Sequence, residues 1–218
     1  MQMALYINQV ISCPLDRLLI IMLYFLNGGI EMSYKYNCLD LSNILNHKAC
    51  SLKDSEEGGY LTISGSSIPE EYMPFNKVFE YNTIPFYMGK QSNWDNLELS
   101  GQRVFLSDTE ASAIHVIGTS SMTDMEEEIE IYYKDTTIHT APLKLSYFGT
   151  DPSKTDNECF IQIPFLYSGT KVNSKIQPCI WYTKLSLPVP SLIDSILLGE
   201  NPCMHIFSIT VEKQTEKE

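Results

Sequence analysis

The stretch Gly89–Arg103, with the sequence GKQSNWDNLELSGQR, combines an aromatic ring with several planar hydrogen-bonding side chains. The C–H faces of sugars stack on aromatic rings, while amide, carboxylate and guanidinium groups bind sugar hydroxyls. Trp94 is one of only 2 tryptophans, and we expect it to stack on a sugar while its neighbours bind hydroxyl groups. The expected ligand-binding residues are Gln91, Trp94, Asp95, Asn96, Gln102 and Arg103. In the alternative interpretation, Trp94 only closes one end of the hydrophobic core.

A second stretch has the composition of a possible calcium loop. Glu56 and Glu57 precede Gly58 and Gly59, and the glycines allow a tight loop that presents carboxylate and backbone oxygens together. Ca²⁺ is a hard cation that takes oxygen ligands, so these glutamates are candidate ligands of a structural calcium ion. The loop lacks the alternating Asp and Asn ligands of known calcium loops, and an ordinary turn is the alternative.

The sequence contains none of the common catalytic motifs. There is no Gly-x-Ser-x-Gly, no His-Glu-x-x-His, no Gly-x-Gly-x-x-Gly and no phosphate loop. Glycoside hydrolysis is the alternative function, because it needs only two carboxylates that face each other across a sugar. Glu128 and Glu130 fit this poorly, since alternate residues of a strand point to the same side. His115 and His205 lie within apolar strands and are expected to be packed core histidines.

The charge balance argues against nucleic acid as a partner. The chain carries 15 Lys and Arg residues against 27 Asp and Glu residues, which gives a net charge of −12. Phosphate binding needs clustered Lys and Arg, and the basic residues of this chain are scattered. We therefore expect a carbohydrate or a partner protein, and neither nucleic acid nor a membrane span. None of the 6 cysteines forms a Cys-x-x-Cys pair, so we expect buried free thiols.

The hydrophobic pattern predicts an all-β domain. Short runs of β-forming residues alternate with polar residues and are separated by turn signals, which is typical of a sandwich or jelly roll. We predict a single antiparallel β-sandwich with a jelly-roll topology over residues 35–213, followed by a flexible tail over 214–218. The predicted strand regions are Gly59–Gly65, Lys77–Met88, Leu97–Asp108, Ser112–Met122, Glu127–Leu145, Glu158–Gly169, Cys179–Pro188, Leu192–Gly199 and Cys203–Lys213.

The first 31 residues raise the question of where the native protein starts. Leu18–Leu26 is the most apolar run, but it is shorter than the roughly 20 residues that span a bilayer. It lacks the basic flank and the small-residue cleavage site of a good signal peptide. Gly28–Met32 can be encoded by GGA-GGT-ATT-GAA-ATG, which contains a purine-rich ribosome-binding sequence. We therefore predict that Met32 is the natural start and that residues 1–31 are a translated leader, with a weak signal-like segment as the alternative. We expect a cytoplasmic protein if Met32 is the true start, and a secreted one if residues 1–31 act as a signal.

Several segments resemble, in order, one bacterial β-sandwich family. LDLSNILNHKA at Leu39–Ala49, for example, is similar to a family motif V-D-L-S-x-x-x-N-x-K-G. The similar segments are Leu39–Ala49, Glu56–Pro74, Asn82–Asp108, Ala113–Met122, Glu128–Thr137 and Ser195–Glu212. The family is the galactose-binding-like jelly roll of the carbohydrate-binding-module type, often found beside catalytic domains of bacterial glycoside hydrolases.

The resemblance implies a sandwich fold and a non-catalytic, accessory sugar-binding role through loops at one end of the sandwich. The family sequence F-D-G corresponds here to Glu56-Glu57-Gly58, which departs from the family's calcium ligands. A scaffold or interaction domain is the third interpretation, favoured if the sheet face that carries Tyr132 is flat, apolar and exposed.

Overall fold

The computed structural model describes residues 35–55 and 58–213. The predicted leader (residues 1–31), Glu56 and Glu57 of the calcium loop, and the predicted tail (residues 214–218) lie outside this part of the chain. The described residues belong to one compact unit. Within them, no helix has the length and apolar character needed to span a membrane.

The described residues form strands and short turns of 3₁₀-helix, with no α-helix among them. The strands are β1 (Tyr36–Cys38), β2 (Cys50–Ser51), β3 (Ser66–Pro69), β4 (Val78–Tyr81), β5 (Ile84–Tyr87), β6 (Leu97–Glu98), β7 (Arg103–Ser120), β8 (Met125–Tyr133), β9 (Ile138–Leu145), β10 (Glu158–Gln162), β11 (Leu166–Ser168), β12 (Lys171–Asn173), β13 (Cys179–Leu197) and β14 (Met204–Lys213). The 3₁₀ turns are η2 (Ser42–Ile44), η3 (Glu70–Tyr72) and η4 (Pro152–Lys154).

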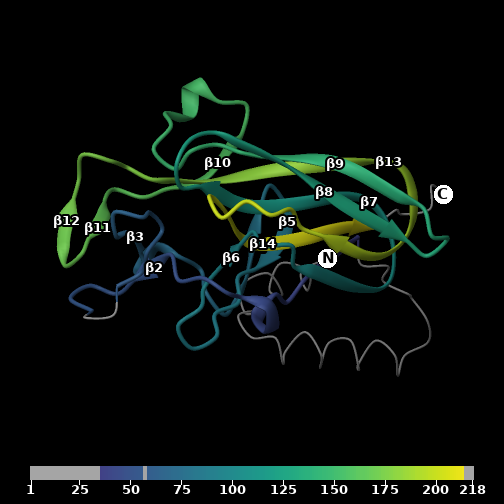
Figure 1. Cartoon of the computed structure of the whole chain (residues 1–218), viewed down its shortest axis with the longest axis horizontal. Helices are drawn as coiled ribbons and strands as arrows, with labels where there is room; N and C mark the ends of the chain where they lie inside the picture. Colours follow the sequence, from purple (N-terminus) through teal and green to yellow (C-terminus); the bar gives the residue numbers. More distant parts are fainter. Residues whose placement is uncertain (1–34, 56–57, 214–218) are drawn as a thin grey trace, which may run out of the picture. The chain divides into compact units, whose positions relative to one another are not determined.

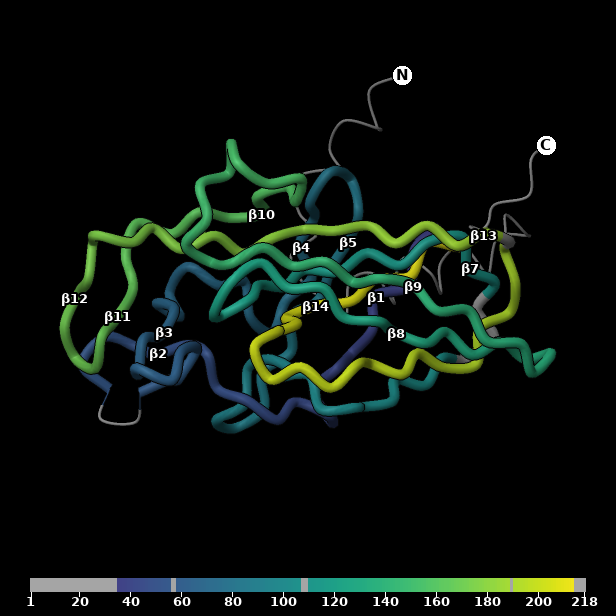
Figure 2. The backbone as a smooth tube through the Cα atoms, turned by 45° about the horizontal axis from the view of Figure 1, so that its top comes forward, coloured from purple at the N-terminus to yellow at the C-terminus, as the bar shows by residue number. Residues whose placement is uncertain are grey.

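Most of the strands belong to one antiparallel sheet. Its order is β1-β14-β7-β13-β8-β9, with β10 paired to β13 and β6 paired to β14. A four-stranded sheet, β12-β11-β3-β2, lies at one end of the large sheet and contains one parallel pair, β2 with β3 (Figure 1). Figure 2 shows these four short strands grouped together from a second direction. The prediction of an all-β, antiparallel β-sandwich is confirmed.

The large sheet folds back on itself to make two layers. β13 pairs with β8 through Ile193–Leu197 and with β10 through Cys179–Tyr182, while β14 pairs with the second half of β7. The register of β13 against β7 shifts between Ser186 and Ser191. Such bulges bend a strand. β7 and β13 therefore each contribute one half to the β8–β9 layer and the other half to the β14 layer.

The core lies between these layers and follows from the alternation in the sequence. In β8, Ile129, Ile131 and Tyr133 are buried, and the residues between them point outward. They pack with the inward-facing side chains of β9 and β14 in one cluster. Each fully buried Ile or Leu contributes about 1.5–3 kcal/mol relative to an exposed one. The period-two pattern is therefore sufficient to assign the inner face of these strands.

Several predicted strand regions differ from the structure. Cys179–Pro188 and Leu192–Gly199 lie mostly within the single strand β13, and Glu158–Gly169 is divided between β10 and β11. Gly59–Gly65 forms turns, because Thr62 bonds Ser66 through both its backbone and its hydroxyl group before β3 begins. Lys77–Met88 is a hairpin of β4 and β5. Asn82 and Thr83 have φ values of 51° and 64°, which reverses the chain at a position where the sequence shows no glycine.

We predict that Gly118→Ala destabilises the protein, because there is no space for a side chain at this position of β7. A Cβ at Gly118 of β7 would lie 2.5 Å from the His205 carbonyl oxygen of β14 and 2.9 Å from the Leu145 side chain of β9. Overpacking of this kind costs about 1–3 kcal/mol. Urea denaturation measures the loss. Gly58→Ala is the control, since its Cβ would meet only Ser51 Oγ at 3.8 Å, and equal losses in both variants would contradict the prediction.

Candidate functional site

Trp94 lies at the end of a tight turn in the segment between β5 and β6. The backbone groups of Gln91 and Trp94 bond each other in both directions, at 3.0 and 2.9 Å. Ser92, at the top of the turn, has a φ of 51°. The Trp94 residue is 46% exposed, and Gln91 is also exposed. The turn therefore presents an indole ring to solvent.

Asp95, the next residue, is completely buried. Its carboxylate accepts hydrogen bonds from the backbone N–H groups of Ala49 at 2.8 Å and Cys50 at 2.9 Å. Burial raises the pKa of Asp95, and the hydrogen bonds from Asn96, Ala49 and Cys50 oppose this. The carboxylate thus ties the base of the Trp94 turn to β2, and both its oxygens are used inside the protein.

Asn96 is also completely buried and lies between two imidazole rings. Its Oδ1 is 3.1 Å from His205 Nδ1, and its Nδ2 is 3.1 Å from His47 Nδ1. The same Nδ2 donates to Asp95 Oδ1 at 2.7 Å, which fixes the orientation of the amide. Since an amide oxygen only accepts, His205 carries its proton on Nδ1.

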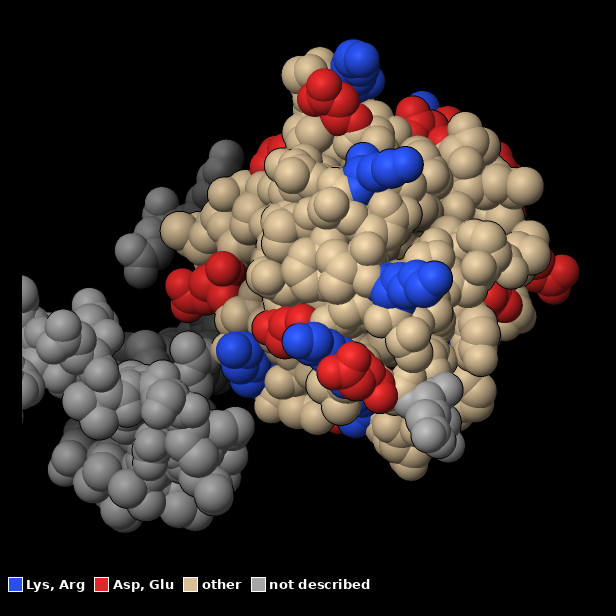
Figure 3. Space-filling model, turned by 90° about the vertical axis from the view of Figure 1, so that its left-hand side faces the viewer, with Lys and Arg blue, Asp and Glu red and all other residues tan. Residues whose placement is uncertain are grey.

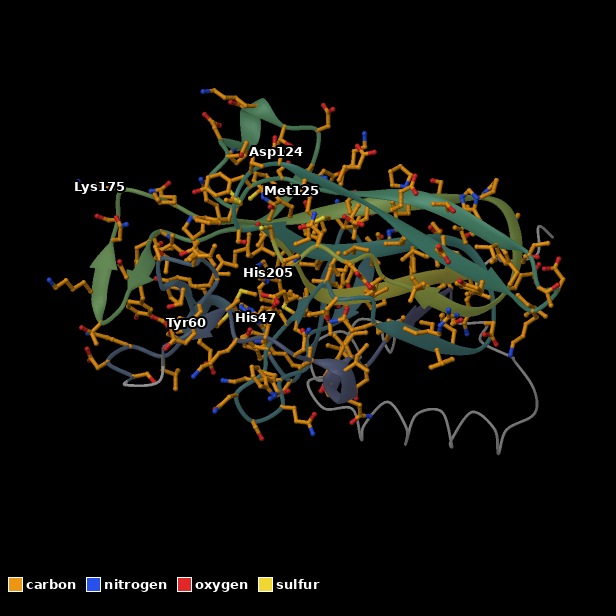
Figure 4. The ribbon with its side chains drawn as sticks, viewed as in Figure 1. His47, Tyr60, Asp124, Met125, Lys175 and His205 are labelled. Atoms are coloured by element: carbon orange, nitrogen blue, oxygen red, sulfur yellow. The ribbon has the colours of Figure 1, made fainter. Side chains whose placement is uncertain are left out.

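His47, Glu98 and His205 come together around Asn96. β-pairing places His205 of β14 opposite Glu98 of β6, and an isolated bridge places His47 opposite Asn96. One potential ligand atom from each of the three side chains lies within 4.8 Å of the other two. The His47 and His205 ring centroids are 4.7 Å apart, and Figure 4 shows the two residues close together. Burial lowers the pKa of His205 to about 3, and the nearby His47 adds to this effect, so His205 is neutral near pH 7.

Gln102 and Arg103 have different surroundings. Gln102 Nε2 donates to the Glu98 carbonyl oxygen at 2.7 Å, so Gln102 supports the segment that carries Glu98. The Arg103 guanidinium carbon lies 4.1 Å from the centre of the Tyr132 ring, and its Nη1 donates to Ser195 Oγ at 2.9 Å. The guanidinium group thus already contacts protein side chains on the outer face of the β7–β13–β8 layer.

Tyr60, in the segment before β3, is a second exposed aromatic residue. Its residue is 64% exposed, and its N–H donates to the Lys48 carbonyl oxygen at 2.7 Å. The N–H of Asp95 donates to the His47 carbonyl oxygen, one residue earlier, at 2.9 Å. The backbones of Tyr60 and of Asp95, the residue after Trp94, therefore bond adjacent carbonyl groups of the segment that leads into β2. In Figure 4, Tyr60 lies on the side of His47 that faces the four-stranded sheet.

The end of the molecule that carries the four-stranded sheet is rich in exposed apolar groups. Figure 3 views this end and shows a broad uncharged area between scattered charged side chains. The large exposed hydrophobic residues in or next to this sheet are Leu52, Tyr60, Ile63, Tyr72 and Val172. Tyr60 therefore belongs to a surface suited to stacking and apolar contact.

An open groove with a volume of about 1010 Å³ lies between β9 and β13. Its charged and polar lining includes Asp124, Glu126, His139, Lys144, Asn157 and Lys184, and no Phe, Tyr or Trp among the described residues lines it. Glu126 pairs with Lys144 at 2.9 Å, and Asp124 accepts the Tyr147 N–H at 2.8 Å. These carboxylates are thus already paired within the protein.

The outer face of the β7–β13–β8–β9 layer carries a row of aligned residues. Phe105 lies opposite Ser195, Ser195 opposite Tyr132, and Tyr132 opposite Ile138. Phe105 is 73% exposed and Ile138 is also exposed, while Arg103 covers part of Tyr132. This outer apolar row is a second surface on which large hydrophobic groups face solvent.

Sequence reasoning located part of this site and missed part. The polar stretch around Trp94 does contain residues that build the site, but Asp95 and Asn96 do so from inside the protein. His47 and Glu98 were not predicted as functional residues, and His205 was expected only as a core histidine. Alternation did indicate that His205 is buried, but nothing in the sequence indicates that Asn96 and Glu98 lie beside it.

The comparison with protein families agrees with the observed architecture. The family model for the AziU2-like beta-sandwich domain matches residues 35–215. A search of the curated proteins finds no match for the chain. The matched range contains every described strand, from β1 to β14. The chain therefore belongs to the family of AziU2-like beta-sandwich domains.

Proposed function

We propose that this domain is a non-catalytic binding module for carbohydrate, with Trp94 and Tyr60 as its aromatic platform. One observation carries the proposal: two exposed rings belong to segments whose backbones bond adjacent carbonyl groups, with the N–H of Asp95, next to Trp94, on His47 and the N–H of Tyr60 on Lys48. Sugars present apolar C–H faces that stack on such rings. Gln91, exposed in the same turn as Trp94, offers an amide group for sugar hydroxyls.

The rigid base of the Trp94 turn favours binding. Asp95 fixes the turn to the backbone of Ala49 and Cys50 through two hydrogen bonds inside the protein. A ring that is already ordered loses little conformational entropy when a ligand stacks on it, and this increases the affinity available from a small contact. In this proposal Asp95 and Asn96 position the platform, and Trp94 and Gln91 contact the sugar.

The experiment is a glycan microarray followed by calorimetry with the best glycan. We expect Trp94→Ala to lower the affinity at least about tenfold, equivalent to about 1.4 kcal/mol, and Trp94→Phe to retain part of it. Tyr60→Ala is expected to weaken binding to a smaller extent. Phe105→Ala is the matched control, because it removes an exposed ring on another surface. Unchanged affinity in Trp94→Ala, or no glycan retained by the wild-type chain, would refute the proposal.

Protein interaction is the second candidate function, and the outer apolar row favours it. Phe105, Tyr132 and Ile138 lie in register across the sheet, and aligned apolar groups of this kind are typical of binding surfaces. The same variants distinguish the two functions. Loss of binding in Phe105→Ala but not in Trp94→Ala would assign recognition to the outer apolar row.

Glycoside hydrolysis has less support. It would need two carboxylates facing each other across a sugar. In the groove between β9 and β13, Glu126 is paired with Lys144, and Asp124 is bonded to the backbone of Tyr147. Glu128 and Glu130 alternate along β8 on the side opposite the buried residues.

A further inference from the structure

The side chains of His47, Glu98 and His205 provide two imidazole nitrogens and a carboxylate at one place. One potential ligand atom from each lies within 4.8 Å of the other two. In particular, His47 Nε2 is 3.6 Å from Glu98 Oε2. Protein zinc sites use such nitrogen and oxygen ligands at about 2.0–2.2 Å from the metal, so atoms around one ion lie a few ångströms from each other. The spacing is compatible with three ligands around a single cation after small side-chain adjustments.

His205 supplies an independent indication of a missing partner. Its Nε2 is buried and has no hydrogen-bond partner. The bond from Nδ1 to Asn96 Oδ1 keeps the proton on Nδ1, so Nε2 carries a free lone pair. Buried polar groups in folded proteins nearly always have a partner, and an orphaned one calls for an explanation such as a bound ion or water. Metal-ligating histidines commonly donate their other N–H to a carbonyl or carboxylate oxygen, as His205 does.

We propose that His47, Glu98 and His205 bind a divalent transition-metal ion of the zinc type. Two imidazole nitrogens favour zinc and its neighbours over Ca²⁺ and Mg²⁺, which prefer oxygen ligands alone. The side chain of Glu98 is 34% exposed and that of His47 is 16% exposed, so the ion can enter from that side. With three protein ligands, a tetrahedral ion keeps one position for water or another ligand.

His47 must change tautomer for this binding. In the described arrangement its Nδ1 accepts from Asn96 Nδ2, so its proton is on Nε2, toward Glu98. The cation takes the place of the Nε2 proton, which moves to Nδ1 of the same ring. The contact between Nδ1 and Asn96 Nδ2 is lost, while Asn96 keeps its bond to Asp95 at 2.7 Å. No proton is released in this exchange.

Calorimetric titration of the whole chain with ZnCl₂ tests the proposal. We expect one Zn²⁺ per chain, and at least about a tenfold loss of affinity in His47→Gln, Glu98→Gln and His205→Gln. His139→Gln is the matched control, because it removes a histidine of β9 outside the cluster and should leave the affinity unchanged. CaCl₂ and MgCl₂ should give no binding at the same concentrations.

The absorption spectrum of the Co²⁺-loaded chain identifies the ligand type. Nitrogen and oxygen ligands give visible bands without the near-ultraviolet band of a cobalt–thiolate bond, so the free cysteines can be distinguished from the proposed site. If His205→Gln does not fold, His47→Gln and Glu98→Gln still test the proposal. Both positions are partly exposed, so these variants are expected to fold. No Zn²⁺ binding, equal binding by wild type and His47→Gln, or a thiolate band would each overturn the proposal. Trp94→Ala should keep its zinc affinity, so this test is independent of carbohydrate binding.

Discussion

Replacing Asp95 with alanine is expected to lower the free energy of unfolding by about 3–5 kcal/mol. The carboxylate is completely buried and accepts the N–H groups of Ala49 and Cys50 and the side-chain amide of Asn96. Without it, the N–H groups of Ala49 and Cys50 remain buried with no acceptor, and each such donor costs about 1–3 kcal/mol, while the Asn96 amide loses one of its acceptors. Urea denaturation followed by circular dichroism measures the change.

Two further variants test the interpretation. Asp95→Asn keeps the shape and one acceptor oxygen but turns an NH₂ group toward a backbone donor, so an intermediate loss is expected. Asp135→Ala is the control, because Asp135 accepts hydrogen bonds only from Thr137 in an exposed hairpin turn, and its loss should be clearly smaller. If Asp95→Ala unfolds at the same urea concentration as the wild type, the carboxylate does not hold β2 and the Trp94 turn together.

The second large effect is a loss of stability in acid that depends on Glu212. This carboxylate of β14 lies 2.9 Å from Lys35, 2.9 Å from Lys184 and 3.2 Å from His115 Nε2. Burial alone would raise the pKa of Glu212, but the hydrogen bonds from Lys35, Lys184 and His115 outweigh it and lower the pKa from 4.5 to about 2. The carboxylate is thus more acidic in the folded chain than in the unfolded chain.

The sign of the pH effect follows from this difference. Above about pH 4.5 the group is ionised in both states, and its full stabilisation is present. As the pH falls from about 4.5 to about 2, the unfolded chain takes up the proton first and the stabilisation is lost. A pKa difference of this size corresponds to about 3 kcal/mol. We therefore expect the wild type to lose about that much more stability than Glu212→Gln between about pH 7 and pH 2.

The comparison between variants is essential, because other groups titrate in the same range. Burial raises the pKa of Asp95, so its own contribution changes in the opposite direction with pH. Subtracting the Glu212→Gln curve from the wild-type curve removes such shared terms. Glu126→Gln is the control, since its pair with Lys144 is exposed on both sides and contributes little. Parallel curves for wild type and Glu212→Gln across this range would rule out the stabilising role.

Much of the fold could be predicted from the sequence, because alternation directly reports which face of a strand is buried. This worked for β8, where Ile129 and Ile131 alternate with glutamates. It failed for Gly59–Gly65, where the same alternation exists but hydrogen bonds within the Thr62–Ser66 turn prevail. It also failed to divide Lys77–Met88, since the reversal at Asn82 and Thr83 uses left-handed backbone without glycine.

The candidate site was less predictable, because it depends on pairing between distant segments. Composition indicated the Trp94 stretch, but it could not show that Asp95 and Asn96 point inward while Trp94 points outward. The approach of His47, Glu98 and His205 requires the register of β6 against β14 and the bridge from His47 to Asn96. A lone histidine in an apolar strand gives no signal of such partners.

The course of β7 and β13 has a consequence for how the molecule comes apart. Each strand supplies one half to each layer, and the two strands pair with each other through nearly their whole length. Neither layer can lose its structure without removing a central strand from the other. The two layers should therefore unfold together in one cooperative transition, with no stable intermediate in which only one layer is folded.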